Sequence, residues 1–129
     1  MALPRRILVV GDDADVRVVV TTALEMEGYA VSVATDGEDA LRAIAGERPD
    51  LIVLDLRLPG RSGRDVAEAL RAGGVGVPIL ALGAASDLGA AAGEIGAAGW
   101  LAQPFDVLDL LEKVARLCPP ARGARPSQR

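Results

Sequence analysis

The chain has 129 residues, of which half are hydrophobic and a quarter are charged, and its formal net charge is −4. This composition predicts one globular domain and excludes a nucleic-acid surface spread over the whole domain, because phosphate binding needs concentrated Lys and Arg. The chain has one cysteine, Cys118, and no histidine, which excludes an intrachain disulfide and the usual zinc-ligand sets.

The sequence contains no pattern typical of export or of a membrane span. The first ten residues hold only a four-residue apolar run, too short for the core of a signal peptide. The longest uncharged stretch, 72–86, contains glycines and Pro78 and is shorter than the roughly 20 residues that a membrane span needs. We therefore expect a cytoplasmic protein with no membrane partner.

Five short apolar runs alternate with helical patterns along the chain. Runs of Ile, Val and Leu are typical of central strands in a parallel sheet, because both faces of such strands are buried. The alternation predicts a parallel sheet covered by helices on both faces. The runs are 7–10, 31–33 in a weaker alternating form, 51–54, 79–82 and a brief 100–102.

Four segments between and after these runs have apolar residues at offsets of three and four, which predicts amphipathic helices. Asp106 is a predicted N-cap, and prolines directly after Cys118 end the last of these helices. The predicted helices run from about 16 to 28, from 35 or 36 to 46, from 63 to 73 and from 106 to 118.

A further helix is predicted between Ser86 and Gly96, and it is the weakest of the five. It contains Gly89 and Gly93, each of which costs roughly 1 kcal/mol relative to Ala in a helix interior. We expect this helix to be short, frayed or mobile.

The domain is predicted to occupy residues 1–118. The segment after Pro120, "ARGARPSQR", has no apolar pattern and three arginines. Residues 119–129 are therefore predicted to form a disordered basic tail.

Acidic side chains follow two of the predicted strands. Asp12 and Asp13 follow the first, and Asp55 follows the third. Because ligands bind at the carboxyl ends of parallel strands, these carboxylates are expected to converge, and a hard cation such as Mg²⁺ would compensate their repulsion. An Asp after a strand is also a common cap or turn residue, an alternative of equal weight for Asp12 or Asp13 taken alone. The loop after Asp55, "LRLPGRSG", is too long for a simple cap.

Four segments occur in a characteristic order: "ILVVGDDADVR", "DLIVLDLRLPGRSG", "VPILALGA" and "GWLAQPF". Together they resemble the receiver domain of bacterial two-component response regulators, from Arg5 to about Leu117. The resemblance implies an α/β, flavodoxin-like, doubly wound fold, with a five-stranded parallel sheet in the order 2-1-3-4-5 and five helices in three α/β/α layers. It also implies a signalling module and not an enzyme, with at most autophosphorylation from a phosphodonor.

By this resemblance, Asp55 is the phosphoacceptor. The resemblance also implies that Mg²⁺ is held by Asp12, Asp55 and the backbone carbonyl of Arg57, with Asp13 as a further candidate ligand. It assigns no catalytic residue beyond these.

The acidic loop, residues 11–13, can be aligned with the acidic pair of the family in two registers. Arg17 lies five residues beyond the second acidic position of many receivers, which puts Gly11 and Asp12 at the acidic pair of the family. The other register puts Asp12 and Asp13 there but needs a one-residue shift. We favour the first register on motif spacing.

In the favoured register, three of the five side chains of the family's site are altered. Gly11 replaces the first acid, Gly83 replaces the Ser or Thr after the fourth strand, and Gln103 replaces the Lys before Pro-Phe. In the family, an aromatic ring on the fifth strand moves together with the hydroxyl of this Ser or Thr. Trp100 occupies the place of that ring. Because phosphoryl transfer depends on charge neutralisation, we expect slow acceptance at Asp55 and weak Mg²⁺ binding.

Two functions fit this pattern. The first is an atypical receiver that acts as a protein-interaction module with weak or absent phosphorylation control. The alternative is a phosphorylatable single-domain response regulator that accepts phosphate from a histidine kinase on Asp55 with Mg²⁺. A haloacid-dehalogenase-like phosphatase would need a second Asp where Arg57 stands, and a nucleotide or flavin binder would need a Gly-rich turn where "GDDAD" stands.

The expected partner is a histidine kinase or another signalling protein. We expect it to bind the face formed by the fourth helix, the fifth strand and the fifth helix. A homodimer is a further option, and no direct contact with nucleic acid is expected.

Overall fold

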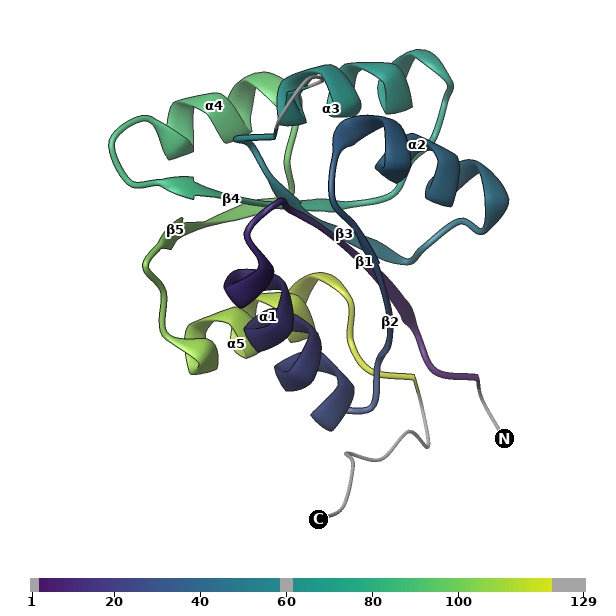
Figure 1. Cartoon of the computed structure of the whole chain (residues 1–129), viewed down its shortest axis with the longest axis vertical. Helices are drawn as coiled ribbons and strands as arrows, with labels where there is room; N and C mark the ends of the chain where they lie inside the picture. The colour runs from purple at the N-terminus through teal and green to yellow at the C-terminus, as the bar shows by residue number, and fades with distance from the viewer. Residues whose placement is uncertain (1–2, 59–61, 122–129) are drawn as a thin grey trace.

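The computed structural model describes residues 3–58 and 62–121, and its five strands form one parallel sheet in the order β2-β1-β3-β4-β5 (Figure 1). The predicted fold class and strand order are confirmed. Each predicted run lies within a strand, and each strand extends beyond its run by one or two residues at one or both ends. The strands are β1 (Arg6–Val10), β2 (Ala30–Ala34), β3 (Leu51–Asp55), β4 (Ile79–Ala84) and β5 (Gly99–Gln103).

Five helices connect and follow these strands, as predicted. None of the helices within the described ranges has the length and apolar character that a membrane crossing requires. The helices are α1 (Ala14–Met26), α2 (Gly37–Gly46), α3 (Gly63–Ala72), α4 (Leu88–Ile95) and α5 (Val107–Leu117).

Most of these helices begin at a side chain that accepts hydrogen bonds from the first turn. Asp13, Asp36, Ser62 and Asp106 each do so, which typically stabilises a helix by about 1 kcal/mol. The exception is α4, whose N-cap residue Asp87 makes no such bond. With eight residues, α4 is short as predicted.

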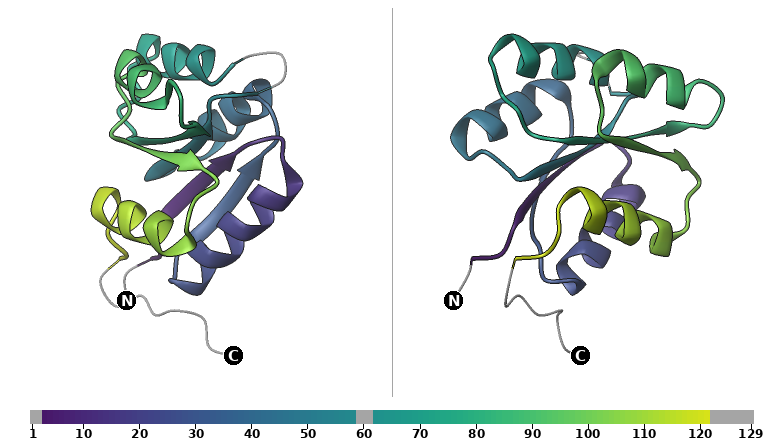
Figure 2. Two further views of the ribbon diagram at one scale, coloured as in Figure 1. Left: turned by 90° about the vertical axis from the view of Figure 1, so that its left-hand side faces the viewer. Right: turned by 180° about the vertical axis from the view of Figure 1, so that it is seen from behind.

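The helices lie in two layers on opposite faces of the sheet (Figures 1 and 2). One layer contains α2, α3 and α4, and the other contains α1 and α5. Alternate residues of the buried strand β3 enter the two cores, so that Leu51 and Val53 pack on the α1–α5 side, whereas Ile52 and Leu54 pack on the other. This alternation decides on which side of the sheet a functional side chain emerges.

A buried hydrogen bond joins two elements at the amino end of the sheet. The Tyr29 hydroxyl, between α1 and β2, donates to the backbone carbonyl of Cys118 at 2.6 Å. Burial raises the pKa of Tyr29 to about 12. The chain remains packed beyond this point, because Ala121 is also buried. The remainder of the predicted tail, 122–129, lies outside the described residues, and the predicted domain boundary at 118 stays a prediction.

The raised pKa of Tyr29 predicts a loss of stability at alkaline pH. Between the ordinary pKa of 10.0 and about 12, the folded protein retains a proton that the unfolded chain has released. The contribution of Tyr29 is therefore fully present below about pH 10 and is lost as the pH rises through about 12. Urea unfolding should show this dependence in the natural protein and not in Tyr29→Phe, which should also lose about 1 kcal/mol at neutral pH. The same alkaline slope in both proteins would contradict the prediction.

Candidate functional site

The predicted site residues lie at the carboxyl ends of the strands. Asp55 is the last residue of β3 and Gln103 is the last residue of β5. Gly83 was expected after the fourth strand, but it lies inside β4 and pairs with Ala102 of β5. The strand continues because parallel pairing with β5 still satisfies its backbone groups. Position 83 is therefore held by the sheet and not by a loop.

Asp55 is the one buried charged or polar residue in the described ranges, at 7% exposure. Its Oδ1 accepts a hydrogen bond from the backbone N–H of Arg57 at 2.9 Å. Burial raises the pKa of the Asp55 carboxyl, and the carboxylates of Asp12 and Asp13 raise this pKa further, while the Arg57 N–H lowers it. An ionised Asp55 thus sits where its charge is costly, and a cation would stabilise it.

Gly11 faces Asp55. A Cβ atom on Gly11 would lie 3.6 Å from the Asp55 Cβ and 3.9 Å from its Oδ2. The Gly11 carbonyl accepts a hydrogen bond from Arg17 Nη1 at 2.8 Å, which ties the acidic loop to α1. This geometry supports the register that places Gly11 and Asp12 at the acidic pair, since a side chain at position 11 would enter the site.

The two acidic residues after β1 have different surroundings. The Asp13 carboxylate accepts hydrogen bonds from the N–H groups of Asp15 at 2.9 Å and Val16 at 3.1 Å, and so caps α1. Asp12 is exposed, and its charge raises the pKa of Asp55. The capping role that we considered for both residues thus belongs to Asp13. Asp12 is the better candidate to face a bound cation.

The donors available for a metal are oxygen atoms. The described residues contain no group of three or more His, Cys, Asp or Glu side chains that could hold a metal ion. Two carboxylates, on Asp12 and Asp55, remain beside the loop of Arg57. Carboxylate and carbonyl oxygens are ligands that suit Mg²⁺, which also retains several waters in protein sites. The donor chemistry therefore fits Mg²⁺, with few protein ligands.

Gly83 packs against α4. Its neighbours Leu80 and Leu82 lie in the α1–α5 core and Ala81 lies in the opposite core, so position 83 faces the α4 side. A Cβ atom on Gly83 would come within 3.1 Å of the Leu88 Cδ1, a methyl group that would have to move. Asp55, by the same alternation, emerges on the α1–α5 side. The space that a hydroxyl-bearing side chain would use is thus partly taken by Leu88.

Trp100 lies on α4 without contacting position 83. Its side chain is 49% exposed, and a Cβ atom on Gly89 would lie 3.5 to 3.7 Å from three atoms of its indole ring. The ring therefore packs against the helix at Gly89. The sequence identified both residues but not this contact, because nothing in the chain order brings them together.

Gln103 carries an unsatisfied donor. Its Nε2 is buried and has no hydrogen-bond partner in the described part of the chain. The residue also lines a cleft of about 440 Å³ with Val19 and Phe105, between α1 and the segment that follows β5. A neutral amide here supplies no positive charge, which is the loss that we expected from the replacement of the family's Lys by Gln103.

Comparison with known proteins gives a consistent result. The family model described as the response regulator receiver domain matches residues 7–115. The response regulator MprA of Mycolicibacterium vanbaalenii is 40% identical over 117 residues, covering 89% of this chain and 51% of that protein. The DNA-binding response regulator MtrA of Mycobacterium tuberculosis is 45% identical over 119 residues, covering 88% and 50%. The chain thus spans about half the length of these relatives.

Solved structures show the same fold. The chemotaxis response regulator CheY4 of Vibrio cholerae superposes with a TM-score of 0.82 at 31% identity, covering 88% of this chain and 98% of that one. The receiver domain of NtrX from Brucella abortus superposes with a TM-score of 0.80 at 28% identity, covering 86% and 96%.

The contact between position 11 and Asp55 predicts the effect of an added carboxylate. In Gly11→Asp the new Cβ fits at ordinary contact distance, and the added negative charge should strengthen Mg²⁺ binding about tenfold. Isothermal titration calorimetry measures this affinity. Gly46→Asp is the matched control, because position 46 is open and remote from Asp55. Equal Mg²⁺ affinities of the two variants would contradict the placement of Gly11 in the site.

Proposed function

The chain belongs to the response regulator receiver domain family, and on this basis we propose that it is a protein-interaction module of two-component signalling whose output face is under weak phosphorylation control or none. Receiver domains are signalling modules that interact with histidine kinases and other proteins. We place the partner on the face formed by α4, β5 and α5, where Trp100 is half exposed.

The packing of Leu88 against Gly83 is the observation that carries this proposal. Phosphorylation at Asp55 can control a distant face only if some group moves between two positions and carries the change. At position 83 there is no side chain to move, and Leu88 is buried beside it. Trp100 rests on Gly89 instead. The output face therefore has no side-chain link at position 83 to report a change at Asp55.

A second function is favoured by the surroundings of Asp55. We propose, as this second candidate, a phosphorylatable regulator in which Asp55 accepts a phosphoryl group from a histidine kinase. Arg57 holds Oδ1 through its backbone N–H, which leaves Oδ2 as the oxygen that we assign to attack phosphorus. The P–N bond of the kinase's phosphohistidine breaks as the acyl phosphate forms on Asp55, and the imidazole nitrogen leaves with the bonding electrons.

A divalent cation belongs to this second candidate. Receiver domains generally bind Mg²⁺ at the phosphorylation site, and we assign Asp12, Asp55 and the Arg57 carbonyl to hold it. When bound, it neutralises charge on the transferring phosphoryl group. With Gly11 and Gln103 neutral, this chain supplies one acid fewer and one cation fewer than the family pattern. We therefore expect binding to be weak.

Modification at Asp55 is tested with acetyl phosphate and intact-mass spectrometry at several Mg²⁺ concentrations. We expect slow, Mg²⁺-dependent gain of one phosphoryl group in the natural protein and none in Asp55→Asn. Asp13→Asn is the matched control, because an asparagine can still cap α1 while one nearby charge is lost. No adduct at high Mg²⁺ would exclude the second candidate function.

Control of the output face is tested separately through Trp100, the only tryptophan of the chain. Beryllofluoride with Mg²⁺ should leave the Trp100 fluorescence essentially unchanged, even when ¹⁹F NMR shows that Asp55 is occupied. Restoring a hydroxyl and a cation together, in Gly83→Thr with Gln103→Lys, should produce a response if Leu88 gives way. A saturable response in the natural protein that is lost in Asp55→Asn would exclude the first function.

A further inference from the structure

β2 is an edge strand with one open side. In the described part of the chain it pairs only with β1 (Figure 1). Edge strands are commonly protected against pairing by charged residues, prolines or bulges. The five residues of β2, "AVSVA", include no charge and no proline, and Ser32 and Val33 are exposed. The edge is therefore unprotected.

The hydrogen bonds of β2 show which backbone groups face the open side. The Ala30 N–H donates to the Arg5 carbonyl at 2.9 Å, and the Ala34 carbonyl accepts from the Gly11 N–H at 3.0 Å. Because successive residues of a strand direct their backbone groups to opposite sides, Ala30, Ser32 and Ala34 face β1. Val31 and Val33 therefore direct their N–H and C=O groups toward the open edge.

The sequence of β2 reads the same in both directions. A two-fold contact between copies requires a surface that is complementary to itself. If two β2 strands pair antiparallel with the axis at Ser32, Val31 of each copy faces Val33 of the other. These residues present the outward backbone groups, so each Val31–Val33 pair exchanges two hydrogen bonds and the two pairs make four. No charged residue lies within the paired segment, so the copies meet there without like-charge repulsion.

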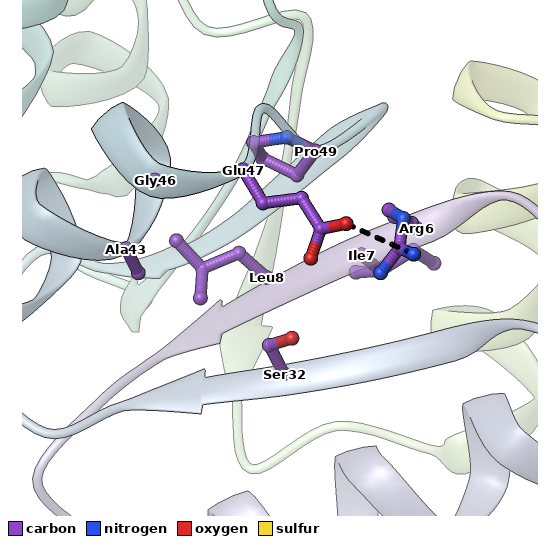
Figure 3. Close-up of a pocket in the computed structure, with 8 residues that line it drawn as sticks. All are labelled: Arg6, Ile7, Leu8, Ser32, Ala43, Gly46, Glu47 and Pro49. Carbon is purple, nitrogen blue, oxygen red and sulfur yellow. Dashed lines mark ion pairs between the residues drawn. The ribbon is translucent and has the colours of Figure 1, made fainter.

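The side chains of the two paired β2 strands are also compatible with each other on both faces of the extended sheet. Val31 packs with the α1–α5 core, and Val33 emerges on the same face with 48% exposure, so the valines of two copies would meet there. Ser32 points to the other face, where it lines a cleft of about 240 Å³ beside the end of α2 (Figure 3). Ala43 and Gly46 of α2 also line this cleft, and their small size leaves the Ser32 side of the edge open.

The opposite edge of the sheet lacks this property. Antiparallel pairing of two β5 strands about Leu101 would place Trp100 opposite Ala102 and Gly99 opposite Gln103. These pairs differ greatly in size and polarity, so β5 is a poor partner for itself.

We infer that β2 is a homodimerisation edge, on which a second copy of this chain adds its own β2 antiparallel and extends the sheet across the two-fold axis. This interface is separate from the α4–β5–α5 face and does not depend on Asp55. Because the paired segment is short, the dimer should be weak and concentration-dependent.

The position of the axis is tested by disulfide formation. Facing residues in a non-hydrogen-bonded antiparallel pair have Cα atoms about 4.5 Å apart, within the range that a disulfide spans. Ser32→Cys should therefore form a covalent dimer under mild oxidation at least tenfold faster than Val33→Cys. In the second variant each introduced cysteine faces Val31 of the other copy, so the two cysteines do not face each other. The natural Cys118 is buried and is common to both variants. Equal rates for the two variants would overturn the assigned register.

The dimer itself is tested by sedimentation velocity from about 10 µM to about 1 mM, the range in which small interfaces dissociate. We expect a reversible monomer–dimer equilibrium that persists in Asp55→Asn and is lost in Val33→Lys. Val19→Lys is the matched control, since Val19 is a valine of similar exposure on α1, and thermal unfolding confirms that both variants are folded. A natural protein that stays monomeric throughout, or a dimer that survives in Val33→Lys, would overturn the inference.

Discussion

The burial of one carboxylate at the end of β3 is the constraint on which the site depends. β3 is buried along its whole length, and Asp55 is its last residue, so the strand that anchors both cores also carries the charge. A buried carboxylate costs free energy unless hydrogen bonds or a cation compensate it. Here one backbone N–H from Arg57 does so, and Asp12 and Asp13 add repulsion. The geometry is therefore suited to binding a cation.

The two faces of the sheet separate Asp55, the proposed phosphoacceptor, from the residues that would read out its state. Asp55, and the Gly11 position opposite it, open toward the α1–α5 layer. Gly83 and Trp100 face α4 on the other side. A change at Asp55 could reach the α4 side only through residues at the carboxyl ends of the strands. At that edge of this chain, position 83 is a glycine that packs against Leu88. In the first function that we propose, the residues around Asp55 thus remain in place while the output face has no coupling to them.

Sequence patterns predicted most of the architecture because strands and helices depend largely on the propensity and polarity of residues that are neighbours in the chain. Short apolar runs, one of them with an alternating pattern, predicted all five strands, and apolar periodicity predicted four of the five helices. The errors lie at strand ends, where β4 continues to Ala84 and incorporates Gly83. Local composition marks Gly83 as a break, but pairing with β5 overrides that preference. The Tyr29 hydrogen bond to Cys118 spans 89 positions of the chain, and no local pattern could predict it.

The sequence by itself determined which chemical groups are present: Asp55 after a buried strand, two acids after the first strand, neutral residues at positions 11, 83 and 103, and an uncharged "AVSVA". Only the tertiary structure decided what each group faces. It assigned Asp13 to the cap of α1, directed position 11 toward Asp55, put Leu88 beside Gly83 and Trp100 on Gly89, and left one side of β2 open. The reason is physical: propensity and polarity act between neighbours in the chain, whereas contacts depend on strand order and on the alternation of side chains across the sheet.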